Sequence, residues 1–106
     1  MKVMISQPML NKTNEQIKAE RKDVVQELKS RNYEVIDTII EEEAPNGTNA
    51  PVFYLAKSIE YISQADKVLF MNGWENARGC KIEHEICKQY KIPILYENTI
   101  RALKGE

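Results

Sequence analysis

The chain alternates between short apolar runs and segments whose apolar residues recur every three or four positions. The runs have the length of strands, and the spacing in the other segments is typical of helices. Strands are expected near residues 2–6, 33–38, 67–72 and 92–96, with a helix after each of them. Strict alternation of strand and helix, together with nearly continuous apolar strands, predicts a parallel sheet that helices cover on both faces.

The length and charge of the chain limit its organisation and its partners. A chain of 106 residues fits one compact unit, so a single domain over residues 1–106 is expected. Its 15 basic and 16 acidic residues form no basic block, which argues against a nucleic acid polymer as partner. The apolar runs are too short to span a membrane and the first residues lack a signal-peptide pattern, so no membrane partner and a cytoplasmic location are expected.

The two cysteines are expected to be reduced thiols in the core. Cys80 and Cys87 are seven positions apart on one predicted helix, too far for a disulfide within that helix. They do not have the clustered spacing of a zinc site, and no other residue set has the spacing of metal ligands. No metal and no cofactor are therefore expected.

A ligand is expected at the loops that follow the strands. Open parallel sheets bind ligands outside the carboxyl ends of their strands, near the point where the strand order reverses. The loops in question are residues 6–9, the loop after Asp37, residues 72–79 and residues 96–97. Candidate binding residues should therefore be sought there.

One carboxylate, that of Glu83, lies where the third predicted helix should be apolar. At about 100° per residue, Glu83 falls inside the apolar arc of this helix. The arc is formed by Cys80, Ile82, Ile86, Cys87 and Tyr90. A carboxylate on a buried face must find a partner, be neutralised or line a cavity. Three roles follow for Glu83: an ion pair in a packed face, a nucleophile, or a non-catalytic ligand contact.

Three short motifs stand out: two include these loops or Glu83, and one precedes the third strand. They are Ser6-Gln7-Pro8-Met9 after the first strand, Ala65-Asp66 before the third strand, and the series Gly73-Trp74, Gly79 and Glu83-His84. Together they resemble the motifs of the nucleoside 2-deoxyribosyltransferase-like superfamily, most closely those of its small members in phage and bacterial genomes. The resemblance covers nearly the whole chain.

The resemblance implies both a fold and an activity. The fold is flavodoxin-like (Rossmann-like), a three-layer α/β arrangement with a parallel sheet of about four strands. Enzymes of the superfamily cleave the N-glycosidic bond of nucleosides or nucleotides, and a glutamate at the Glu83 position attacks the anomeric carbon. A second base or water then resolves the glycosyl-enzyme, a two-step displacement for which a carboxylate is a competent nucleophile. A homodimer or higher homo-oligomer is also implied, with pockets completed by a neighbouring subunit.

Two positions depart from the pattern of the relatives. Relatives usually carry glycine at the Gln7 position, so the glutamine either narrows the entrance or adds a contact of its own. Relatives commonly carry serine at the Ala77 position, which resembles the phosphate-binding serine of nucleotide hydrolases. Both departures favour an alternative function, the binding or sequestering of a nucleotide-derived small molecule without turnover. A purely structural subunit is a third hypothesis.

The other candidate contacts each have a structural alternative. Arg21 lies in the apolar arc of the first predicted helix. Its guanidinium either binds a phosphate or a carboxylate, or reaches water while the aliphatic part of the side chain packs on the core. Trp74 either stacks on a base or caps the core or a dimer contact. Asp66 is expected mainly to begin a strand, although Asp66, Asn72 and Asp37 are also candidate proton or hydrogen-bond donors for the leaving base.

The start of the third predicted helix offers backbone groups as well as side chains. Gly79 is expected in its first turn, where backbone amides can bind an anion. His84, the only histidine, falls toward the polar face and is expected to be exposed or at an interface. The full set of candidate substrate contacts is Ser6, Gln7, Pro8, Met9, Arg21, Asp66, Asn72, Gly73, Trp74 and Gly79.

Overall fold

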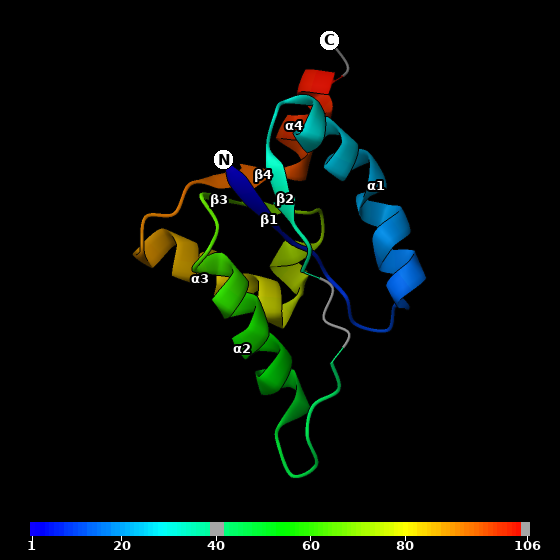
Figure 1. Ribbon diagram of the computed structural model, residues 1–106, viewed down its shortest axis with the longest axis vertical. Coiled ribbons are helices and arrows are strands. Elements are labelled where there is room, and N and C mark those ends of the chain that lie inside the picture. Colours follow the sequence, from blue (N-terminus) through cyan, green and yellow to red (C-terminus); the bar gives the residue numbers. More distant parts are fainter. Residues whose placement is uncertain (39–41, 105–106) are drawn as a thin grey trace.

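The computed structural model describes residues 1–38 and 42–104, and it contains one parallel sheet. The strands are β1 (Lys2–Ser6), β2 (Glu34–Ile36), β3 (Lys67–Phe70) and β4 (Ile94–Tyr96). They pair in the order β2-β1-β3-β4, and every pair is parallel (Figure 1). This is the strand order of a flavodoxin-like sheet, so the predicted α/β fold class is confirmed.

Helices cover both faces of this sheet (Figure 1). They are α1 (Asn14–Ser30), α2 (Ala50–Ile62), α3 (Arg78–Gln89) and α4 (Glu97–Lys104), with a short 3-10 helix η1 (Trp74–Asn76) before α3. The core on one face joins Val3 and Ile5 of β1 to α1 and α4. The core on the other face joins Met4 of β1 to Ile62 of α2 and Cys87 of α3. None of the described helices is long and apolar enough to cross a membrane.

The alternation of side chains along β1 continues past its last residue and separates two candidate residues. Successive side chains of a strand point to opposite faces of the sheet. Ser6 accordingly follows Met4 and lies toward α3, where it bonds to Glu83. Gln7 follows Ile5 and lies toward α1, where it bonds to Arg21.

The helices begin where local sequence supplies caps, with one exception. Thr13 and Gln16 form a reciprocal capping box at the start of α1, and the Asn49 side chain accepts a hydrogen bond from Val52 N at the start of α2. Helix α3 begins at Ala77, which has no side chain able to cap it. The first turn of α3 therefore has no side-chain cap.

Two predicted features of the fold are wrong in detail. The apolar arc of α3 is narrower than expected, because Ile82 is 39% exposed and Tyr90 is 77% exposed, whereas Cys80, Glu83 and Cys87 are buried. The buried positions i, i+3 and i+7 form a narrow stripe, and Ile86 packs partly buried beside it. Strands β2, β3 and β4 are also shorter than predicted: β2 at both ends, β3 at its end and β4 at its start.

Candidate functional site

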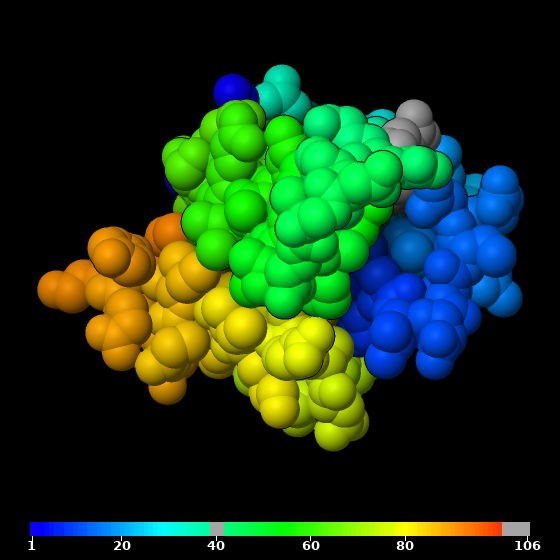
Figure 2. Space-filling view, turned by 90° about the horizontal axis from the view of Figure 1, so that it is seen from below, coloured from blue at the N-terminus to red at the C-terminus, as the bar shows by residue number. Residues whose placement is uncertain are grey.

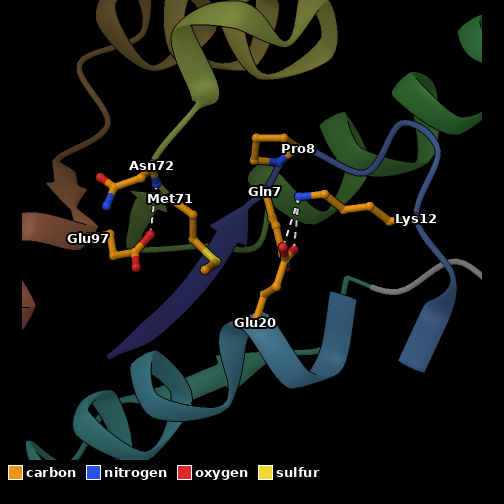
Figure 3. Close-up of a pocket in the computed structure, with 7 residues that line it drawn as sticks. All are labelled: Gln7, Pro8, Lys12, Glu20, Met71, Asn72 and Glu97. Atoms are coloured by element: carbon orange, nitrogen blue, oxygen red, sulfur yellow. Dashed lines mark hydrogen bonds and ion pairs between the residues drawn. The ribbon is translucent and has the colours of Figure 1, made fainter. Parts of the chain in front are cut away.

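The carboxyl ends of β1 and β3 border a cavity of about 350 Å³ at the point where the strand order reverses. The cavity lies between the sheet, α1 and the start of α4 (Figure 3). Its lining residues are Gln7, Pro8, Lys12, Glu20, Met71, Asn72 and Glu97. Seen from below the view of Figure 1, this end of the molecule has α2 in green at its centre, the start of α3 in yellow and the β1–α1 segment in blue (Figure 2).

A tight turn after β3 brings the two loops of the cavity together. Gly73 has φ of +91°, a conformation that residues with a side chain rarely adopt. A Cβ atom at Gly73 would lie 3.5 Å from Cγ of Pro8, so the turn also packs directly against the loop after β1. This glycine holds Asn72 at the cavity and starts η1.

Gln7 and Arg21 form a buried network on the α1 side. The Arg21 side chain donates from Nε to Oε1 of Gln7 at 2.8 Å and from Nη1 to Oγ1 of Thr38 at 3.3 Å. Gln7 donates from Nε2 to the Ile17 carbonyl and to Oε1 of Glu20, each at 3.1 Å. Burial lowers the pKa of Arg21, and the charge of Asp37 acts in the opposite direction.

A charge pair stands at the mouth of the cavity. Nζ of Lys12 donates to both carboxylate oxygens of Glu20, at 3.0 and 3.1 Å (Figure 3). The hydrogen bond from Lys12 lowers the pKa of Glu20. No local pattern predicts this pair, because the two residues are eight positions apart across a loop and a helix start.

Glu97 closes the opposite wall. Its Oε1 accepts a hydrogen bond from the backbone N–H of Asn72 at 2.8 Å, and the Asn72 side chain donates to Oδ1 of Asn98 at 3.0 Å. The loop predicted at residues 96–97 is absent, because Tyr96 ends β4 and Glu97 begins α4. The position of Glu97 after the last strand was the only sequence signal available.

The Glu83 carboxylate lies on the other face of the sheet from the cavity. Its Oε1 accepts a hydrogen bond from Oγ of Ser6 at 3.2 Å, and its Oε2 is buried with no hydrogen-bond partner among the described residues. The residue is 6% exposed. Burial raises the pKa of Glu83 to about 7, although the bond from Ser6 acts in the opposite direction.

Neutral sulfur groups, rather than a cation, share the buried stripe with Glu83. Cys80 and Cys87 are buried free thiols, and burial raises the pKa of each to about 11. Within the part of the chain that the structure describes, no ion pair to Glu83 is formed. Glu83 therefore has no cationic partner among the described residues, and the hypothesis of an ion pair in a packed face gains no support.

Open space lies beside the first turn of the same helix. A Cβ atom at Gly79 would meet no atom within 4 Å. Gly79 and Glu83 are four positions apart, so they lie on the same side of α3, one turn from each other. The uncapped amides at the start of α3 adjoin this space.

An aromatic cluster lies next to α3. The rings of Trp74 and His84 stack with centroids 4.0 Å apart and planes 17° apart, and His84 Nε2 is 2.8 Å from the Tyr96 hydroxyl. Of the two expected environments for His84, full exposure is not found, because the residue is half-buried in this cluster, and burial lowers its pKa. Since His84 covers one ring face of Trp74, only the other remains for stacking.

The sequence candidates occupy four kinds of position. Gln7, Pro8 and Asn72 line the cavity, whereas Arg21, Ser6, Gly73, Trp74 and Gly79 surround it or lie near Glu83 without lining it. Met9 is 37% exposed on the loop after β1. Asp66 lies at the opposite edge, where its Oδ2 accepts a hydrogen bond from the Lys2 backbone at 2.7 Å. The prediction that Asp66 contacts substrate is therefore wrong, because strand direction places it at the amino ends of β1 and β3.

One comparison with known proteins gives a match. The family model described as Domain of unknown function (DUF4406) matches residues 1–96, which include all four strands and helices α1 to α3. No curated protein and no solved structure matches the chain.

Proposed function

The chain belongs to the DUF4406 family, and we propose that it cleaves the N-glycosidic bond of a nucleoside or nucleotide, with Glu83 as the nucleophile. The observation that carries the proposal is the buried Oε2 of Glu83, which has no hydrogen-bond partner among the described residues. A carboxylate oxygen left without a partner in an apolar site is costly. A reacting carbon that bonds to this oxygen would supply the partner that it lacks, and the open space one turn away at Gly79 could hold part of the substrate.

The proposed chemistry uses the two oxygens of Glu83 differently. Ser6 holds Oε1 by a hydrogen bond, which orients the carboxylate and leaves Oε2 for the anomeric carbon. Attack forms a C1′–Oε2 bond and breaks the C1′–N bond, and the base departs with the electron pair and takes up a proton. Water, or a second base, then displaces Glu83 from the sugar. The activity in this proposal is cytoplasmic.

The leaving base needs a hydrogen-bond donor near the rim. The Asn72 amide is suited to this role by position, because it lies at the cavity and its side chain donates to Oδ1 of the exposed Asn98. Asp66 is not suited, since it lies at the other edge of the sheet. Asn72 is therefore the proposed contact to the base.

A second function, ligand binding without turnover, is favoured by one specific observation. The 350 Å³ cavity lies on the α1 side of β1, and Glu83 does not line it. A molecule held only by Gln7, Asn72 and their neighbours would not touch the Glu83 carboxylate. In this alternative the protein captures a nucleotide-derived small molecule and Glu83 has a structural role.

Chromatographic detection of free base separates the two functions. The purified protein is incubated with ribo- and deoxyribonucleosides and their 5′-monophosphates. The catalytic proposal predicts base release that falls by roughly a thousandfold in Glu83→Gln, since the amide cannot form the glycosyl-enzyme. Glu85→Gln is the matched control, because Glu85 is exposed on the same helix. No base release from any substrate by the wild-type protein would favour the binding function.

A further inference from the structure

Gln7 is held entirely by protein groups, although it lines the cavity. It is 5% exposed, and both hydrogens of its amide nitrogen are used by Ile17 and Glu20. Its amide oxygen accepts from Nε of Arg21 at 2.8 Å. The side chain is thus fixed between the cavity and Arg21.

Arg21 is a buried cation whose guanidinium is only partly hydrogen-bonded by the described residues, and the negative charge of Asp37 acts on it. It is 5% exposed, and its Nη2 is buried with no hydrogen-bond partner among the described residues. A guanidinium remains charged in proteins and binds carboxylate or phosphate through two parallel N–H groups. Here Nε bonds instead to the neutral amide oxygen of Gln7.

The charges that do face the cavity oppose an anion. Lys12 is the only cationic residue in the lining, and its Nζ bonds to both oxygens of Glu20. Glu97 adds a second carboxylate to the lining. A phosphate group in this cavity would therefore meet one neutralised lysine and an additional carboxylate, and like charges at close range repel.

We propose that Gln7 is a specificity-determining residue, which takes the place of an anionic oxygen at Arg21 and restricts the site to an uncharged nucleoside. The inference rests on the proposed function only for the identification of the ligand as a nucleoside. Removal of the amide, as in Gln7→Ala, would open space between the cavity and Arg21. Arg21 would then present Nε and Nη2 to a phosphate.

Thermal unfolding in inorganic phosphate tests this directly. Phosphate is compared with chloride at equal ionic strength for the wild-type protein, for Gln7→Ala and for the double variant Gln7→Ala, Arg21→Met. At about ten times its Kd, phosphate should raise the melting temperature of Gln7→Ala by roughly 5 °C or more beyond the wild-type shift. The double variant should lose this gain. Equal shifts in all three proteins, or a gain that persists without Arg21, would overturn the proposal.

A binding experiment keeps the inference testable if Gln7→Ala does not fold. Calorimetry on the Glu83→Gln protein, which prevents turnover, compares each deoxynucleoside with its 5′-monophosphate. The nucleoside should bind at least about tenfold more tightly. A monophosphate that binds equally or better, or the absence of binding by any nucleoside, would contradict the inference. Nucleoside binding without base release by the wild-type protein would refute the proposed catalysis and leave the inference intact.

Discussion

At the scale of single residues, the adjacent residues Ser6 and Gln7 make contacts on opposite faces of the sheet. Ser6 bonds to the Glu83 carboxylate on one face of the sheet, and Gln7 bonds to Arg21 on the other. Both contacts are buried, and both leave one polar atom without a partner among the described residues, Oε2 of Glu83 and Nη2 of Arg21. Which ligand can bind at this edge of the sheet therefore depends on the groups that bond to these two atoms.

The protonation of Glu83 predicts the pH dependence of the proposed activity. Only the ionised carboxylate can attack, and burial raises the pKa of Glu83 to about 7. The value of kcat/KM should rise with pH and level off above about pH 7. At pH 5 it should be about a hundredfold below the plateau. Steady-state rates between pH 5 and 9 check this, and a profile without an inflection near neutrality would contradict it.

The same group predicts how stability depends on pH. The pKa of Glu83 rises from 4.5 to about 7 on folding, so the folded state binds more protons than the unfolded state between those values. The contribution is fully present below about pH 4.5 and is lost as the pH rises through about 7, by roughly 3 kcal/mol in total.

Glu83→Gln isolates this contribution, because glutamine does not ionise. The free energy of unfolding, measured in urea at pH 5 and pH 8, should fall more steeply for the wild-type protein than for Glu83→Gln. If the free energy of unfolding depended on pH equally in the two proteins, the pKa of Glu83 would not change on folding. That result would contradict the prediction.

At the scale of elements, helix α3 combines a buried carboxylate with a first turn that has no side-chain cap. Helices α1 and α2 begin with side-chain caps, whereas α3 begins at Ala77 without one. Gly79 in its first turn borders open space on the side of Glu83. An element arranged in this way can admit part of a ligand next to the carboxylate.

Gly79→Ala separates this role from folding. The added methyl group meets no atom within 4 Å, and alanine favours a helix over glycine by about 0.5–1 kcal/mol. Stability should therefore stay equal or rise slightly, while base release falls at least about tenfold as the methyl group takes the sugar's place. Urea unfolding and chromatography measure the two effects. Unchanged turnover in a stable variant would exclude a substrate position beside Gly79.

At the scale of the whole molecule, helix α2 is covered by the rest of the chain at one end only. Ile62 is its only buried residue, and Val52 and Ile59 are 57% and 38% exposed. Figure 2 shows the helix standing at the centre of the face at which the β1–α1 segment and the start of α3 also lie. Exposed apolar side chains on one helix support the proposal of a homo-oligomer.

Replacement of an apolar residue on α2 tests that assembly. If two copies pair through α2, Ile59→Lys should shift the protein toward the monomer, because a buried lysine without a partner is costly. Tyr90→Lys is the control, since Tyr90 is 77% exposed at the far end of α3. Sedimentation velocity across a range of concentrations measures the change. A wild-type protein that is monomeric at all concentrations would contradict the proposal.

The sequence by itself determined the features that follow from the spacing of its apolar residues. The order of strands and helices, the parallel sheet and the burial of Glu83 follow from the spacing of apolar residues, and the structure bears them out. These features depend on neighbours within one or two turns, whose positions the period of each element fixes. The same reasoning fails at Ile82 and Tyr90, because the width of a buried stripe depends on what lies against it.

Only the tertiary structure decided which residues meet. Asp66 lies at the far edge because it bonds to Lys2, 64 positions away, and Glu97 reaches the cavity through Asn72, 25 positions away. Glu83 follows closely in the sequence after the loop of residues 72–79, yet β1 separates it from the cavity that Gln7 lines. Such contacts depend on strand order and on which sheet face each helix covers, and these are properties of the assembled sheet rather than of any single segment.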